Sequence, residues 1–482
     1  MTTLTTSIAP FGAFRSDLPP EEIAQADTVR LRTLACWAYI YLMPAFLFVR
    51  QRSEFVQGWE RAAKAGAPVT SGVSAGAVGV AGAPALGSWM MLPKLTDDRT
   101  RTILPQHDCV YGAAHVELDR LGPIVISIPE NPERRYYSVA VLDAFMNNVA
   151  HLGPKWTGNS AGEHLLVGPE WDGDTPAWAA SVVRSPTVSA VLYHRALVGF
   201  KSGDIDVVRR WREGFTLTQL SRYGGSSDSP VDPGVKTDDL VHGDMRTMTD
   251  PSAYFRIAVE HLQHNPQPTE NAWLTALLTE TPFPELTNER SRDAVLAGVA
   301  DAQRILDGAI SGAERRHGWE IPFAHTGEPG PYVLQQAITQ IRAVGANDPA
   351  ESVYILGLRD GDDQPLDASD GSVYELRFDA GKLPPLEEPG FWSATMYRAS
   401  DGYLVANPIN RYSIRTTLPG FERAADGSAT IVMAAALPEG VTEANWLPAP
   451  KDEPFLVCLR LYYPLEPIRD GIWFPPPIER RP

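Results

Sequence analysis

The stretch FWSATMYRASDGYLVANPINRYSI, residues 391–414, decides the expected fold of this chain. It predicts an antiparallel hairpin in which residues 391–397 form an aromatic-rich strand that runs into an Ala-Ser-Asp-Gly turn. Gly402 can take the positive φ that closes such loops, and a second strand then leads to the polar segment 407–412. Polar and aromatic side chains are denser here than a plain core needs, so the hairpin is also a candidate site.

Length and composition favour a multi-core, turn-rich protein. The chain has 482 residues, of which 44% are hydrophobic, and this is enough to bury more than one core. Its 39 glycines and 42 prolines suit a β-rich fold better than a helical bundle. A formal net charge of −17 argues against nucleic acid or an anionic membrane surface as a partner. The charge favours a soluble protein and neither supports nor opposes small-molecule chemistry.

Cysteine usage and the N-terminal sequence bear on location. Cys36, Cys109 and Cys458 form no CxxC pair, so neither a disulfide framework nor a zinc knuckle is expected. No basic region followed by an apolar core, typical of a signal peptide, is visible. The apolar run 35–49 is shorter than the ~20 residues of a spanning helix and is interrupted by Pro44. It predicts a buried helix, and we expect a cytoplasmic protein with no membrane contact.

The pattern along the chain predicts an α+β fold dominated by strands, with two antiparallel β-sandwich or jelly-roll-like domains, N-terminal helices and a helical middle. Within the first β region, residues 123–129 read as a β-branched strand, 130–133 as a turn and 135–145 as the return strand. The expected divisions are an N-terminal helical segment (1–65), a Gly/Ala-rich linker (66–105), a first β domain (106–220), a helical connecting region (221–350) and a second β domain (351–482).

Several motifs together resemble a known family. They are QHDCVYG at 106–112, AGEHLLVGPEW at 161–171, the hairpin at 391–414, and LRLYYPLEPIRDGIWFPPPI at 459–478. These segments resemble the paired domains of unknown function DUF1254, N-terminal, and DUF1214, C-terminal. The resemblance implies two jelly-roll-like domains joined through helical segments, and it implies no particular reaction. At the family's Asn-x-Asp-Thr-x-Tyr motif this chain keeps Asp108 and Tyr111 but has Gln106 and Cys109, so a role for the threonine hydroxyl is in doubt.

Asp108 is the first candidate for chemistry. A carboxylate in a partly buried pocket can act as a general base, with Tyr111 and Tyr137 orienting the substrate. The alternative is that Asp108 caps a turn by accepting hydrogen bonds from backbone amides, which is the commoner use of an aspartate in this setting.

The second candidate is the group Asn407, Asn410, Arg411 and Tyr412. An arginine fork recognises a carboxylate or phosphate with two hydrogen bonds, and the amides could orient a polar ligand. The alternative is a loop in which the asparagines satisfy backbone groups while Arg411 pairs with an acid.

Trp392 and Arg460 complete the expected substrate-binding set. Along residues 455–463, Cys458, Arg460 and Tyr462 share one strand face. They line a cavity or face water, and water is the favoured interpretation.

A metal or other cofactor is not expected. His261 and His264 stand three apart on a predicted helix, but HExxH is absent, and the pair reads as a solvated helix end. The histidines of the first β region have no ligand spacing.

These features lead to two functional hypotheses. The first is a small-molecule enzyme of hydrolytic or lyase type, in which Asp108 supplies acid/base chemistry and Arg411 anchors an anion in a cleft between the β domains. The alternative is a non-catalytic jelly-roll module that binds a ligand or assembles into a homo-oligomer. An enzyme should present Asp108 and Arg411 to one pocket, whereas an assembly protein should bury the regions of Trp392 and Trp473 between chains.

Overall fold

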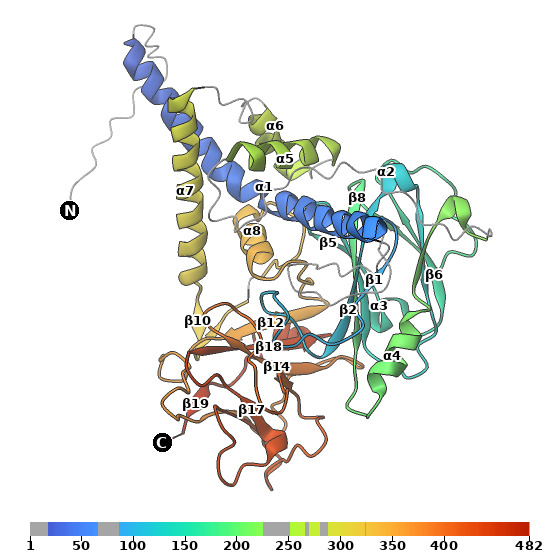
Figure 1. Cartoon of the computed structure of the whole chain (residues 1–482), viewed down its shortest axis with the longest axis vertical. Coiled ribbons are helices and arrows are strands. Elements are labelled where there is room, and N and C mark those ends of the chain that lie inside the picture. Colours follow the sequence, from blue (N-terminus) through green and yellow to red (C-terminus); the bar gives the residue numbers. More distant parts are fainter. Residues whose placement is uncertain are drawn as a thin grey trace.

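The computed structural model describes residues 18–65, 86–224, 251–265, 269–279, 288–322 and 324–481. Residues 66–85 of the predicted linker and 225–250 of the predicted helical middle lie outside the described residues. Helices take up about 30% and strands about 26% of the chain, in four sheets in which antiparallel pairing predominates, so the predicted α+β class is confirmed. Figure 1 shows three parts: a group of helices beginning with α1, a first β region that contains β2 and β6, and a second that contains β14 and β17.

The first β region is a sandwich of two sheets. One sheet has the order β1-β2-β8-β4-β5 and the other β7-β6-β3-β9, and one apolar core lies between them. Its strands are β1 (Met90–Met91), β2 (Cys109–Glu117), β3 (Ile124–Ile128), β4 (Tyr137–Asp143), β5 (Asn148–Leu152), β6 (Gly162–Val167), β7 (Ser181–Arg184), β8 (Ser189–Leu197) and β9 (Thr216–Gln219). Three short helices accompany them, namely α2 (Leu118–Leu121), α3 (Pro154–Thr157) and α4 (Asp204–Arg212).

The expected hairpin of residues 123–145 is wrong in its pairing. Both strands form, but β3 pairs with β6 and β9, whereas β4 pairs with β5 and β8 in the opposite sheet. Ile126 of β3 and Val139 of β4 belong to the same apolar core. The apolar faces of β3 and β4 therefore meet across the sandwich. Packing face to face buries both apolar surfaces, whereas pairing the two strands side by side in one sheet would leave that face uncovered.

The second β region is also a sandwich around its own core, with sheets of order β10-β11-β12-β18-β14-β15 and β17-β16-β13-β19. The first strand predicted within residues 391–414 forms as β14, and Gly402 in the turn after it has a φ of 70°. The predicted second strand, between this turn and residue 407, is wrong: it forms only an isolated bridge from Leu404 to Tyr397, and the strand that pairs antiparallel with β14 is β15, after the polar segment. The strands are β10 (Arg315–Arg316), β11 (Trp319–Glu320), β12 (Ser352–Gly357), β13 (Tyr374–Phe378), β14 (Trp392–Arg398), β15 (Ser413–Ile414), β16 (Ala429–Ala434), β17 (Trp446–Pro448), β18 (Phe455–Tyr462) and β19 (Ile478–Arg480), with a short helix α9 (Glu466–Arg469).

The helices gather around α1, which passes α7 near its N-terminal end and runs across to the first sandwich (Figure 1). They are α1 (Pro20–Ala65), α5 (Pro251–His264), α6 (Ala272–Thr279), α7 (Glu289–Ser311) and α8 (Val333–Arg342). The helix α1 continues through Pro44, although proline removes one backbone hydrogen bond, because the flanking residues Met43 and Ala45 are packed into the helical core. By length and composition its Pro20–Phe55 portion could cross a membrane. However, 78% of its apolar window is buried inside the protein, as expected for a core helix.

Candidate functional site

A cavity of about 1150 Å³ lies where the helices meet the two sandwiches. One wall comes from α1, α7 and α8, a second from β2 and β8, and a third from β12 and β18, while residues of the 92–105 segment line it between the sandwiches. Elements distant in sequence therefore build one interior space.

Strand alternation brings two arginines to this cavity, one from each sandwich. Arg195 of β8 lies opposite Tyr111 of β2, and Arg460 of β18 lies opposite Tyr354 of β12. The neighbours of each arginine along its strand, such as Leu459, turn into the sandwich cores. Because side chains alternate between faces, the arginines and tyrosines are presented to the opposite side, where the cavity lies.

Arg195 is buried, with 7% of its surface exposed. Its guanidinium donates to Asn347 Oδ1 and to the carbonyl oxygen of Gly345, both at 2.9 Å. It also lies 5.9 Å from the ring centroid of Tyr111 and 5.7 Å from that of Tyr193. All of these partners are neutral.

Arg460 is in the same situation, with 4% of its surface exposed. It donates to Thr395 Oγ1 at 3.2 Å and to the carbonyl oxygen of Leu104 at 2.6 Å, and it lies over the ring of Tyr397. The expectation that this strand face meets water is wrong, since Cys458 and Tyr462 are also buried. Among the described residues, neither Arg195 nor Arg460 forms an ion pair with a carboxylate.

Tyr111 and Tyr462, which line the cavity, remain protonated at neutral pH. Burial raises the pKa of Tyr111 to about 12, although nearby arginines act in the opposite direction. Its hydroxyl accepts a hydrogen bond from the backbone N–H of Gln106 at 3.1 Å. Burial also raises the pKa of Tyr462 well above its usual value. These hydroxyls can donate hydrogen bonds to a ligand but are unsuited to act as bases.

Asp108 is not among the residues that line the cavity. It is 4% exposed, its Oδ1 accepts a hydrogen bond from Ser413 Oγ at 3.0 Å, and the same oxygen lies 3.8 Å from Arg415 Nε. The contact joins the first sandwich to the second. This geometry supports neither the predicted general base nor a turn cap, since the partners come from a different part of the chain.

Two other predicted site residues lie in the sandwich cores. Tyr137 packs against Trp211 and Phe215 in the first core, with ring centroids 5.4 and 5.5 Å away. Trp392 packs against Phe378 in the second core, at 5.0 Å. Neither side chain reaches the cavity, because each lies on the strand face that is turned toward its own partner sheet.

The polar loop of the hairpin adopts the structural alternative. Asn407 Nδ2 donates to the carbonyl oxygens of Val405 and Arg411, both at 2.9 Å, and its Oδ1 accepts from the Arg411 N–H at 2.9 Å. Arg411 in turn donates to backbone oxygens, including that of Trp446 at 3.0 Å. The described loop thus satisfies its own backbone, and Arg411 is not among the residues that line the cavity.

The remaining residues of that loop are separated from the cavity as well. Tyr412 is buried, and its hydroxyl donates to Asp98 Oδ1 at 2.6 Å. Asn410 is exposed at a positive φ of 50°, a conformation that asparagine tolerates. Of the nine predicted site residues, the cavity therefore brings together Tyr111 and Arg460.

Arg195 is the cavity residue that the sequence interpretation missed. The pattern of residues 189–193 predicts a short strand, whereas β8 continues to Leu197 and so contains Arg195. The available signal was an arginine among mostly apolar strand residues, as also occurs at Arg460.

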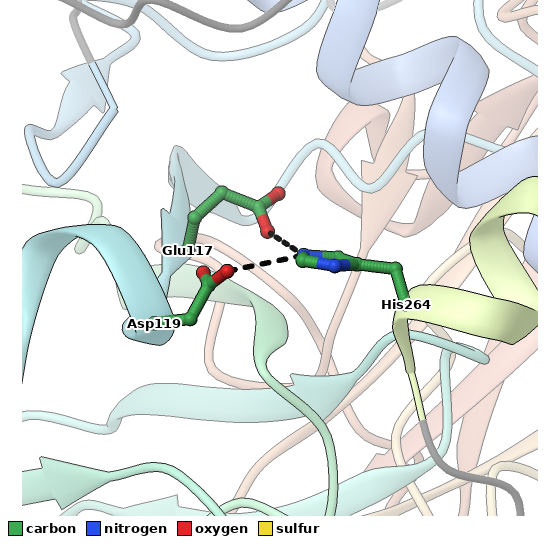
Figure 2. A group of neighbouring side chains, drawn as sticks. All are labelled: Glu117, Asp119 and His264. Atoms are coloured by element: carbon green, nitrogen blue, oxygen red, sulfur yellow. Dashed lines mark ion pairs between the residues drawn. The ribbon is translucent and has the colours of Figure 1, made fainter.

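One group of side chains has the composition of a cation site. Ligand atoms of Glu117, Asp119 and His264 all lie within 4.8 Å of one another (Figure 2). His264 Nε2 is 3.6 Å from Glu117 and 3.5 Å from Asp119, and Arg52 donates to Glu117 at 2.5 Å. Because the guanidinium already neutralises Glu117, we interpret the group as an ion-pair network that ties α5 to the end of β2.

Two family models match the chain. The model described as Protein of unknown function (DUF1254) matches residues 87–219, and the one described as Protein of unknown function (DUF1214) matches residues 351–466. The chain belongs to the tandem DUF1254/DUF1214 family. The resemblance inferred from the motifs is thereby confirmed. The DUF1254 match contains β1 to β9, and the DUF1214 match contains β12 to β18, so each arginine of the cavity comes from a different family domain.

One solved structure shares the fold. The crystal structure of the VPA0106 protein from Vibrio parahaemolyticus aligns with a TM-score of 0.63 at 19% sequence identity, covering 94% of this chain and 100% of that one. A putative uncharacterized protein from Burkholderia cenocepacia aligns at 14% identity with a TM-score of 0.43, over 97% of this chain and 91% of that one. That second likeness is too weak to carry an argument. No curated protein matches the sequence.

Proposed function

We propose that this protein binds a small organic molecule in the central cavity. The observation that carries the proposal is the cavity itself, which has a volume of about 1150 Å³ and lies at the junction of both sandwiches and the helices. Ligand sites typically occupy roughly 300–1,000 Å³, are mostly apolar, and contain a few converging polar groups at the junctions of domains. The buried Arg195 and Arg460 are such groups.

The walls offer complementary surfaces to a ligand. Met43 and Leu47 of α1 and Leu306 of α7 provide apolar contact, and the hydroxyl of Tyr111 provides a hydrogen-bond donor. Since α1 packs on α7 and α8 in one core, the apolar wall is held in place by the helical group. Binding would then require little rearrangement of the fold.

Ligand binding has more support than acid/base catalysis. The carboxylate of Asp108 is engaged by Ser413 and Arg415 away from the cavity, and Tyr111 keeps its proton at neutral pH. Assembly through the aromatic hairpin has less support as well, since Trp392 is buried within its own chain. The hydrolytic or lyase hypothesis assigns the base to Asp108, which is not among the residues that line the cavity.

Native mass spectrometry of the purified protein, compared with its denatured mass, is the first test. We expect a protomer that carries excess mass released by denaturation, or an empty protomer that binds the neutral dye N-phenyl-1-naphthylamine saturably at one site. An empty protomer without saturable dye binding would overturn the proposal. The same spectrum reports the oligomeric state, and an oligomer of fixed size with no ligand would favour assembly.

A further inference from the structure

We propose that the ligand of the cavity is an organic anion whose charged group lies between Arg195 and Arg460 and whose apolar body extends toward α1 and α7. The inference rests on the cavity being a binding site and adds the chemical class of the ligand. A carboxylate or a sulfonate on an apolar skeleton has this chemistry.

The first step of the argument is the charge of the two guanidiniums. Both arginines are more than nine-tenths buried, and the described residues place no carboxylate in an ion pair with either. Taking an ion out of water costs several kcal/mol unless a countercharge and hydrogen bonds compensate for it. Each guanidinium has five N–H donors, and the two neutral acceptors that each contacts leave the charge itself uncompensated. A bound anion would supply the missing countercharge.

The second step is that both guanidiniums act on the same place. Both arginines line the same cavity, and Arg195 lies over the ring of Tyr111. Arg195 donates to Asn347 Oδ1. The backbone N–H of Asn347 in turn donates at 3.5 Å to the hydroxyl of Tyr354, the residue opposite Arg460 in the sheet. The two cations from separate domains are therefore linked through Asn347 and Tyr354 at one part of the cavity wall. Hydroxyl donors beside two guanidiniums are the groups that bind an oxyanion.

The third step concerns the carboxylates on the cavity wall. Glu320 pairs with Arg342 at 2.8 Å, and Glu54 lies 3.6 Å from Arg50, so each has its own cation. Asp307 of α7 is exposed to solvent, where water screens its charge. Asp401, the remaining acid on the wall, pairs with Arg398. Each of these acids therefore has its own cation or faces water, and none of them forms an ion pair with Arg195 or Arg460.

The fourth step concerns the body of the ligand. The helical wall has an apolar part, which contains Met43, Leu47, Leu306, Ile310 and Ile338. A small inorganic anion would leave this wall without a partner. An anion with an apolar skeleton fills both ends of the cavity, which is why we assign an organic rather than an inorganic ligand.

Two dyes of nearly the same shape test the inference on the wild-type protein. The dye 8-anilinonaphthalene-1-sulfonate carries a sulfonate, and N-phenyl-1-naphthylamine is its neutral counterpart. We expect the sulfonated dye to bind about 10-fold more tightly, since charge-assisted hydrogen bonds contribute about 1.5–3 kcal/mol each. Non-specific attraction would act against this result, because the protein has a net charge of −17.

Substitutions locate the binding of the sulfonate. Arg195→Met and Arg460→Met should each weaken the affinity for the sulfonated dye by roughly 10-fold. Each should change the affinity for the neutral dye by less than about 3-fold. The double variant Arg135→Met/Asp204→Asn removes a paired cation together with its acid at a place that does not line the cavity. It is the matched control and should leave the preference between the dyes unchanged. Folding of each variant is checked by circular dichroism.

The outcomes separate the two proposals. Equal affinity for both dyes in the wild-type protein would overturn the anion inference while leaving the cavity as a binding site. Saturable binding of neither dye would overturn the cavity function. The wild-type comparison needs no substitution, so it decides the matter even if an arginine variant fails to fold.

Discussion

The carboxylate of Asp108 and the guanidinium of Arg415 meet at 3.8 Å across the boundary between the two sandwiches. Both residues are buried, and Arg415 also donates to the backbone oxygen of Val198 at 2.8 Å, in the first sandwich. The guanidinium lies over the ring of Phe200 at 4.2 Å. Asp108 therefore holds an arginine that reaches from one domain into the other, and its position is structural.

Asp108→Asn should reduce the free energy of unfolding by about 1–3 kcal/mol, because it leaves a buried guanidinium without its countercharge. Dye binding in the cavity should not change. Denaturant unfolding of Asp108→Asn, Arg415→Gln and the double variant would measure the coupling between the residues. A loss of dye binding at unchanged stability would instead place Asp108 in the functional site.

Two asparagines of the hairpin loop provide a matched pair. Asn407→Ala removes side-chain hydrogen bonds to four backbone groups of the loop, which belong to Val405, Ile409 and Arg411, and should cost about 1–3 kcal/mol. Asn410→Gly should change stability by less than about 0.5 kcal/mol, because the site is exposed and glycine accepts its positive φ. Thermal unfolding distinguishes the two, and similar losses in both variants would contradict the bracing role of Asn407.

The packing of α1 on α7 makes opposite predictions for two glycines of one helix. A Cβ at Gly298 would lie 2.3 Å from the backbone oxygen of Arg32, whereas nothing lies within 4 Å of a Cβ at Gly308. Gly298→Ala should destabilise the protein by about 1–3 kcal/mol or more through overpacking, and Gly308→Ala should stabilise it by up to about 1 kcal/mol. Urea denaturation of both variants provides the comparison. A neutral Gly298→Ala would mean that the two helices can separate at little cost.

The ion-pair network of Figure 2 predicts a pH dependence. Burial opposes ionisation of Glu117, but His264, Arg52 and Ser189 outweigh it and lower its pKa to about 2, from a usual 4.5. Because the folded pKa is depressed, this stabilisation is present above pH 4.5 and is lost as the pH falls toward 2. The full effect is on the order of 3 kcal/mol.

Unfolding measurements between acid and neutral pH would test this for Glu117. The variant Glu117→Gln should be less stable than the wild type at neutral pH, with a difference that shrinks as the solution becomes acidic. Contact with Glu117 raises the pKa of His264. The smaller contribution of His264 to the free energy of unfolding is therefore present below the unfolded-state pKa of the histidine and is lost as the pH rises through the folded-state pKa. A pH-independent difference between wild type and Glu117→Gln would contradict the network.

Some of the candidate site was accessible from the sequence. Period-two alternation places Arg460 and Tyr462 on one face of their strand in the second sandwich. The motif around Tyr111 marks the strand by which the first sandwich lines the cavity. The predicted strand 189–193 ends before Arg195, so the predicted site does not include that arginine. Asp108, Asn407 and Arg411 were singled out for their chemistry, yet in the structure each one satisfies a structural partner.

The sequence by itself determined the α+β class, the buried helix at 35–49, the strand at 391–397 with its turn at Gly402, and the family, because these depend on local periodicity, turn residues and motifs. Only the tertiary structure decided that β3 and β4 face each other across a sandwich, and that Arg195 and Arg460 share one cavity. Alternation shows which residues lie on the same face of a strand, but not what that face meets. An arginine on such a face is typical of solvent exposure, and it became an interior group only when two domains and the helices closed around it.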